Sequence, residues 1–131
     1  MKTIGLIFDS NKNIGEGHFW RCFNLAKVLK KKGRNFFFIS NKLQTKFIKI
    51  LSNENFNYIR IASLKKINLI KKFIKKKKLD VFISDYYDLS EKNKKEIRKK
   101  INSFVVIDDH INKKHYCDIY INNNFMSNKV K

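Results

Sequence analysis

Two hydrophobic patterns alternate along the chain. Runs of six or seven mostly apolar residues are typical of buried strands, and they occupy 3–9, 35–40, 79–85, 103–109 and, as a sixth candidate strand, 117–122. Over 57–62 apolar and polar residues alternate, which predicts a further strand. Between these runs, apolar residues recur three or four positions apart, which is typical of helices that pack on one face. Those helical stretches begin near Phe19, Lys42, Ser63 and Ser90.

The alternation of strands with helices predicts an α/β fold. Right-handed β–α–β units give a Rossmann-like, mostly parallel sheet with helices on both faces. A chain of 131 residues is long enough to bury one core, so we expect residues 1–131 to form a single domain. Ser63 and Ser90 are the predicted N-caps of the third and fourth helices, and Gly33 is the predicted C′ residue of the first.

Residues that carry chemistry follow three of the predicted strands. Positions 9–18 come after the first strand, positions 85–88 after the fourth, and positions 108–110 after the fifth. Because parallel strands end at the same edge of a sheet, and ligands gather at that edge, these segments are expected to lie close together. The sequence therefore predicts a site at the carboxyl edge of the sheet.

The first of these segments contains NIGEGH, in which Gly15 and Gly17 precede His18. Paired glycines allow a tight loop, and the helix that follows presents N–H groups to an anion. A structural turn with a capping histidine is the alternative. A third glycine and an acidic residue about 20 positions later are both missing, which excludes a dinucleotide site, and no cofactor is predicted.

His18 is expected to be neutral, because the positive end of a helix disfavours its charged form. A neutral imidazole at this place suits a general base, although a single histidine is more often idle. In SDYYDLS, Asp85 is positioned to cap or orient, and Tyr87 to donate to a substrate oxygen. An Asx-turn with a packed tyrosine is an equal alternative.

The segment after the fifth strand offers further acceptors. Asp108, Asp109, His110 and His115 are all candidate ligands, yet their spacing matches no common zinc pattern. No metal site is predicted, and organisation of the loop is the favoured role. Cys22 and Cys117 are too few and too far apart for a disulfide framework or a zinc site, so both are expected to be reduced.

The net charge of +19 is the strongest signal in the composition. A binder of nucleic acid or another anionic polymer is one interpretation. The excess is almost all lysine, with four arginines, and nucleic-acid readers depend on arginine for bidentate contacts. A solvated basic surface is therefore favoured, with no sequence-specific nucleic-acid partner. No apolar run reaches the ~20 residues of a membrane span, and the N-terminal stretch lacks the pattern of a signal peptide, so a cytoplasmic protein is expected.

Several motifs together resemble a known family. The N-terminal block fits D-S-x-x-x-I-G-x-G-H-x-x-R-C-x-x-L-A-x-x-L-x-x-x-G, and D-x-Y, V-I-D-D and C-D-I-x-I-N-x-N follow it in order. This combination resembles the UDP-sugar hydrolases of pseudaminic acid biosynthesis, whose reference substrate is UDP-2,4-diacetamido-2,4,6-trideoxy-β-L-altropyranose. Spore-coat polysaccharide proteins belong to the same wider group.

The resemblance implies the N-terminal half of a glycosyltransferase-B-like fold. In the family, water attacks the anomeric carbon of the sugar and UDP leaves. His18 matches the histidine proposed to activate that water, and Tyr87 matches a tyrosine that contacts the sugar or the leaving group. The resemblance also implies a substrate-binding set made of Asp9, Gly15, Gly17, Arg21, Asp85 and Asp109.

In this family a second domain follows and binds most of the nucleotide. That domain is expected to be absent from the 131 residues, so the chain is expected to be incomplete on its own and to need a separate C-terminal partner for the UDP-sugar. A non-catalytic basic domain that binds nucleic acid or another anionic polymer is the alternative.

Overall fold

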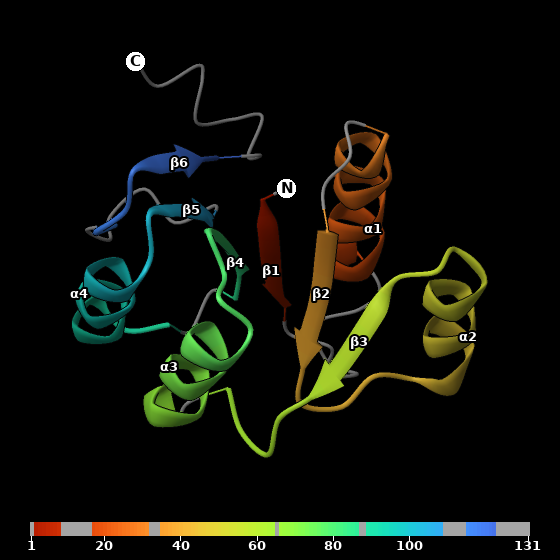
Figure 1. Cartoon of the computed structure of the whole chain (residues 1–131), viewed down its shortest axis with the longest axis horizontal. Coiled ribbons are helices and arrows are strands. Elements are labelled where there is room, and N and C mark those ends of the chain that lie inside the picture. The colour runs from red at the N-terminus through yellow and green to blue at the C-terminus, as the bar shows by residue number, and fades with distance from the viewer. Residues whose placement is uncertain are drawn as a thin grey trace.

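The computed structural model describes residues 2–8, 17–31, 35–64, 66–86, 89–108 and 115–122. Its elements alternate along the chain as the hydrophobic pattern predicts (Figure 1). In order they are β1 (Thr3–Phe8), α1 (Gly17–Lys30), β2 (Asn35–Ser40), α2 (Thr45–Asn53), β3 (Asn57–Arg60), α3 (Ile67–Lys76), β4 (Val81–Asp85), α4 (Glu91–Lys100), β5 (Ser103–Ile107) and β6 (Ile119–Ile121).

The strands form one six-stranded sheet in the order β3-β2-β1-β4-β5-β6. All five neighbouring pairs are parallel, which confirms the predicted Rossmann-like α/β fold. Central β1 consists of a short apolar run, as expected for a strand covered on both faces. The chain leaves β1 towards β2 on one side and later returns to β4 on the other, so the order reverses between β1 and β4.

Helices cover both faces of the sheet, with α1 and α2 on one side and α3 and α4 on the other (Figure 1). Each side has its own buried cluster. Phe19, Phe23 and Phe47 pack from α1 and α2 against Phe8 and other strand residues. On the opposite face, α3 and α4 contribute apolar residues that pack against side chains of the sheet such as Phe82 and Phe104. The sheet therefore lies between two cores.

One predicted helix start is confirmed and another is wrong. Ser90 is the N-cap of α4, and its side-chain oxygen accepts a hydrogen bond from the Asn93 N–H at 3.1 Å. Ser63 is not the N-cap of α3, because the helix begins at Ile67 and its N-cap is Lys66. Leu64 is buried from a turn that precedes the helix, so the apolar spacing of 64 and 67 did not require a helix at both positions. Gly33 lies outside the described residues.

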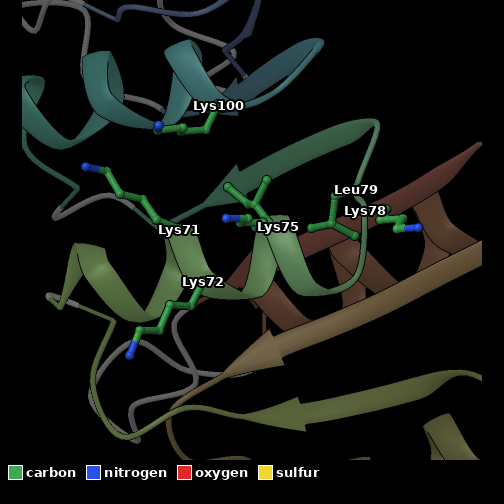
Figure 2. A pocket seen from close by; sticks show the side chains of 7 residues that line it. Lys71, Lys72, Lys75, Lys78, Leu79 and Lys100 are labelled. Carbon is green, nitrogen blue, oxygen red and sulfur yellow. The ribbon is translucent and has the colours of Figure 1, made fainter.

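A pocket of about 500 Å³ opens between α3 and α4 (Figure 2). Its lining is Lys71, Lys72, Ile74, Lys75, Lys78, Leu79 and Lys100. Leu79 precedes β4, and Lys100 ends α4 just before β5. The pocket therefore lies towards the amino ends of the strands, opposite the edge at which the sequence predicts the candidate site.

Candidate functional site

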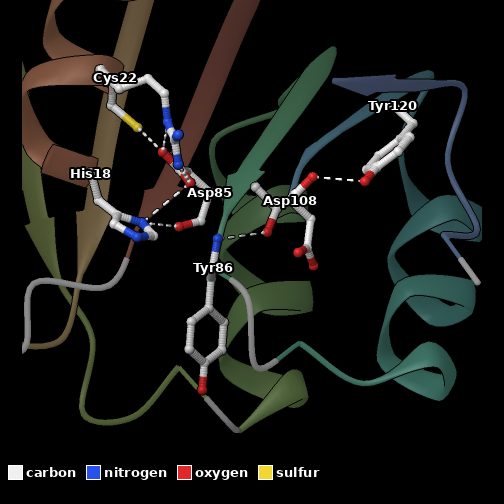
Figure 3. Close-up of polar contacts among 8 residues, drawn as sticks. His18, Cys22, Asp85, Tyr86, Asp108 and Tyr120 are labelled. Atoms are coloured by element: carbon white, nitrogen blue, oxygen red, sulfur yellow. Dashed lines mark hydrogen bonds and ion pairs between the residues drawn. The ribbon is translucent and has the colours of Figure 1, made fainter. Parts of the chain in front are cut away.

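The switch in strand order places the candidate site between the carboxyl ends of β1 and β4. In open parallel sheets, ligands bind in the crevice outside this point. His18 lies in the first turn of α1, which follows β1 in the chain, and Asp85 is the last residue of β4. Figure 3 shows these two side chains directed towards each other across that edge.

Asp85 is the centre of the cluster, and its side chain is fully buried. The Nε atom of Arg21 donates to Asp85 Oδ2 at 2.7 Å, and Arg21 Nη2 also bonds Oδ1. The Cys22 thiol donates to Oδ2 at 3.6 Å. Two nitrogens of one guanidinium on one carboxylate form a geometrically specific pair, so the position of Asp85 is fixed from the side of α1.

His18 is attached to the same residue through Nδ1. That atom lies 2.8 Å from the backbone oxygen of Asp85 and 3.2 Å from its carboxylate Oδ1. A carbonyl oxygen can only accept, so Nδ1 must carry the hydrogen. A neutral imidazole that donates from Nδ1 has its lone pair on Nε2. This is the tautomer that a general base needs, held by a carboxylate in the way that catalytic dyads and triads use.

The charge of Asp85 changes the expected protonation of His18. Burial of the ring is the largest single influence and lowers the pKa of His18, but the hydrogen bonds and the negative charge of Asp85 together outweigh it. Arg21 opposes them by a smaller amount. The pKa of His18 is therefore raised above its ordinary value of 6.5. The helix N-terminus alone predicted the opposite shift, because the sequence does not show Asp85 beside the ring.

The stability contributed by His18 is expected to fall as pH rises. A raised folded pKa means that the folded protein holds the proton more tightly than the unfolded chain does. The contribution is fully present below about pH 6.5, the unfolded value, and is lost as pH passes the raised pKa. Urea unfolding of the wild type and His18→Gln measures it at about pH 5.5 and about pH 9. The difference in free energy of unfolding should be larger at the lower pH; a constant difference would contradict the role of Asp85.

Cys22 takes no nucleophilic role in this cluster. Burial raises the pKa of its thiol well above the ordinary value, and the charge of Asp85 raises it further. Cys22 and Cys117 are both free, as the sequence predicts. The Cys22 thiol therefore remains protonated, and in this state it is a weak hydrogen-bond donor to Asp85.

A second polar cluster lies beside the first, at the end of β5. Asp108 is fully buried, and its backbone oxygen accepts from the Tyr120 hydroxyl at 2.7 Å (Figure 3). The Tyr120 ring stacks on His115 with centroids 4.2 Å apart. The Lys94 ammonium, which is also fully buried, donates to His115 Nδ1 at 3.0 Å. These contacts link β5, α4 and β6, in line with the loop-organising role favoured for this segment.

The structure brings together three of the predicted site residues, His18, Arg21 and Asp85. Gly17 begins α1, where a Cβ would meet no heavy atom within 4 Å. Among the described residues, neither packing nor a left-handed backbone therefore demands glycine at this position. The predictions for Asp9, Gly15, Tyr87 and Asp109 fall outside the described residues.

Three participants were not predicted as partners, namely the Cys22 thiol, Lys94 and Tyr120. Cys22 stands one helical turn after His18, and that spacing is a usable signal for a shared helix face. No such signal marks Lys94, because a lysine in a lysine-rich helix is expected to be exposed.

Within the described ranges, no group of three or more His, Cys, Asp or Glu side chains is placed to hold a metal ion. The described residues also contain no helix whose length and hydrophobicity would let it cross a membrane.

Comparison with known proteins relates the chain to part of a larger protein. Over 120 residues it is 30% identical to the uncharacterized protein MJ1062 of Methanocaldococcus jannaschii, and the alignment covers 91% of this chain and 24% of that protein. The chain thus spans about a quarter of the length of this relative. No family model matches this chain. The chain is a Rossmann-like domain homologous to one part of a longer protein.

Proposed function

We propose that this chain is the sugar-side domain of a UDP-sugar hydrolase, which releases UDP from a diacetamido-trideoxy sugar nucleotide in nonulosonic acid biosynthesis. One observation carries the proposal. His18 is held by Asp85 in the tautomer of a general base, at the edge of the sheet where ligands of this fold class bind. The motif resemblance supplies the substrate, and the geometry supports the role of the histidine.

In the proposed reaction, His18 Nε2 takes a proton from water as the water oxygen attacks the anomeric carbon. The bond between that carbon and the terminal phosphate oxygen of UDP breaks, and its electron pair leaves with UDP. The products are UDP and the free sugar, with one proton on His18 that returns to solvent. Asp85 stabilises the imidazolium that forms, as its buried carboxylate lies 3.2 Å from Nδ1.

The other residues of the proposed site have three roles. Arg21 acts on the reaction through Asp85, because its guanidinium is already engaged with that carboxylate. Tyr87 contacts the sugar or the leaving group on this proposal. Asp9, Gly15 and Asp109 complete the substrate-binding set with Gly17, where an added Cβ would meet no described heavy atom within 4 Å.

The proposal includes a second domain or chain that binds the uridine diphosphate. The greater length of the homologous protein supports it, because that relative extends well beyond the part this chain matches. Binding energy from remote parts of a substrate holds its reacting centre in place. With the sugar-side half alone, water and the anomeric carbon are not held near His18.

The test measures UDP release from UDP-2,4-diacetamido-2,4,6-trideoxy-β-L-altropyranose. The 131-residue chain is assayed alone and as a fusion, after Lys131, to the nucleotide-binding half of a hydrolase from the resembled family. We expect the fusion to release UDP and the isolated chain to release none above background. Turnover by the isolated chain would show that the nucleotide site is misplaced in this proposal. A fusion that neither turns over nor is thermally stabilised by the sugar nucleotide would contradict the hydrolase function itself.

A further inference from the structure

We propose that the pocket between α3 and α4 binds a small anion with a di- or triphosphate group. The inference is independent of the hydrolase proposal, because the pocket lies towards the opposite end of the strands from His18 and Asp85. Its volume of about 500 Å³ falls in the range of small-molecule sites. Its lining combines five lysines with a floor made by two buried apolar side chains, Ile74 and Leu79.

The charges of the lining are largely uncompensated. Lys71 pairs with Glu96, with Nζ 2.7 Å from Oε2. Among the residues that the structure describes, the other four lysines form no ion pair. The C-terminal ends of α3 and α4 add about half a negative charge each, which leaves roughly three positive charges on the pocket. A ligand with two or more phosphate charges matches that excess.

The arrangement of the lysines favours a compact ligand. Figure 2 shows Lys71 from α3 and Lys100 from α4 reaching into the space between the two helices, whereas Lys72 points away from α4 and the Lys78 ammonium points outward beyond Leu79. Interaction with the helix dipoles explains why lysines occur in the last turns. It does not explain why two such turns converge on one concavity whose described lining residues include no carboxylate. Lysine binds phosphate as a point charge and needs no fixed geometry.

The backbone of Lys78 is a second observation at the same place. Its φ of 51° lies in the left-handed region, where glycine is the usual residue after a helix. The Leu79 N–H bonds the Ile74 oxygen at 3.1 Å across this turn, so the conformation is set by the helix end. A lysine is disfavoured here by its Cβ, and the side chain it contributes lines the pocket.

The test measures binding of inorganic tripolyphosphate to the full chain by isothermal titration calorimetry. In Lys75→Gln/Lys100→Gln the dissociation constant should rise at least about tenfold. The control pair, Lys2→Gln/Lys49→Gln, removes the same charge from exposed positions outside the pocket and should change it less than about twofold. Equal losses in both pairs would show general charge attraction and overturn the proposal. No measurable binding by the wild type would overturn it as well.

A single substitution separates binding from folding. Lys78→Gly relieves the left-handed backbone and removes one ammonium, so thermal stability should hold or increase while tripolyphosphate binding weakens. Asn55→Gly is the matched control, because Asn55 has a φ of 59° away from the pocket; its binding should not change. Unchanged binding in Lys78→Gly would contradict the site. A competition experiment tests for a nucleic acid as the occupant. If a short single-stranded DNA displaces tripolyphosphate when the total concentration of DNA phosphate is lower than that of tripolyphosphate phosphate, the small-anion assignment is overturned.

Discussion

Replacing Asp85 with asparagine is expected to lower the free energy of unfolding by about 3 kcal/mol. The carboxylate is fully buried and accepts from Arg21, His18 and Cys22 together. An amide removes the negative charge and places an NH₂ donor where those groups also donate. Arg21 keeps about a quarter of its side chain exposed, which allows partial rehydration and puts the loss at the lower end of the range for broken buried pairs.

The matched control is Glu96→Gln, which makes the same carboxylate-to-amide change. Its ion pair with Lys71 has the same N–O separation of 2.7 Å as the Arg21 Nε to Asp85 Oδ2 bond, but both side chains are partly exposed. Screening by water makes such pairs weak, so only a small change is expected. Urea unfolding followed by circular dichroism measures both variants. Equal losses in the two variants would show that burial does not decide the contribution of Asp85.

Most of the strands were predictable because they are short apolar runs, and β3 was predictable because apolar and polar residues alternate over 57–62. Predicted and observed strands differ mainly at their ends: 79–85 was expected where β4 is Val81–Asp85, since Leu79 is buried before the strand begins. Helix ends were harder to predict. Ser90 has the capping geometry that its residue type favours, whereas Ser63 has the right chemistry without a helix to cap. Local propensity does not determine where packing lets a helix start.

The location of the candidate site in the fold was predictable from the sequence, but the contacts within the site were not. Strand ends in a parallel sheet share an edge, so His18 and Asp85 could be assigned to one region from their positions after the first and fourth strands. The assignment could not show that the Asp85 carboxylate meets both Nδ1 of His18 and the guanidinium of Arg21. Those contacts join residues more than 60 positions apart, and they reverse the expected direction of the His18 pKa shift.

The sequence alone also could not decide between a solvated basic surface and an anion-binding surface, because that choice depends on contacts between distant segments. Runs such as 75–78 indicate a solvated face when they are considered alone. The pocket forms because Lys100, from another helix, lies across from α3. Convergence of this kind depends on tertiary packing of α3 on α4, which no charge count along the chain contains.

In the fused enzyme, His18→Asn is expected to reduce the rate of UDP release by roughly 10²–10⁴-fold, the usual contribution of a general base. The substitution is selective. The asparagine side-chain NH₂ can donate from close to the position of Nδ1, so the hydrogen bond to the Asp85 oxygen is retained, while Nε2 is deleted. KM should change little, because the ring is proposed to contact water and not the nucleotide.

The pH profile distinguishes this base from a structural histidine. Only neutral His18 can accept a proton, so the wild-type rate should fall as pH drops through its raised pKa. In His18→Asn that acidic limb should vanish, and the residual rate should vary little with pH over the same range. A merely structural role would lower the rate without removing the limb, since the titrating group would remain elsewhere. A rate within a few-fold of wild type, in a variant that still binds the sugar nucleotide, would remove His18 from the mechanism and leave Asp85 as a stabilising residue of the fold.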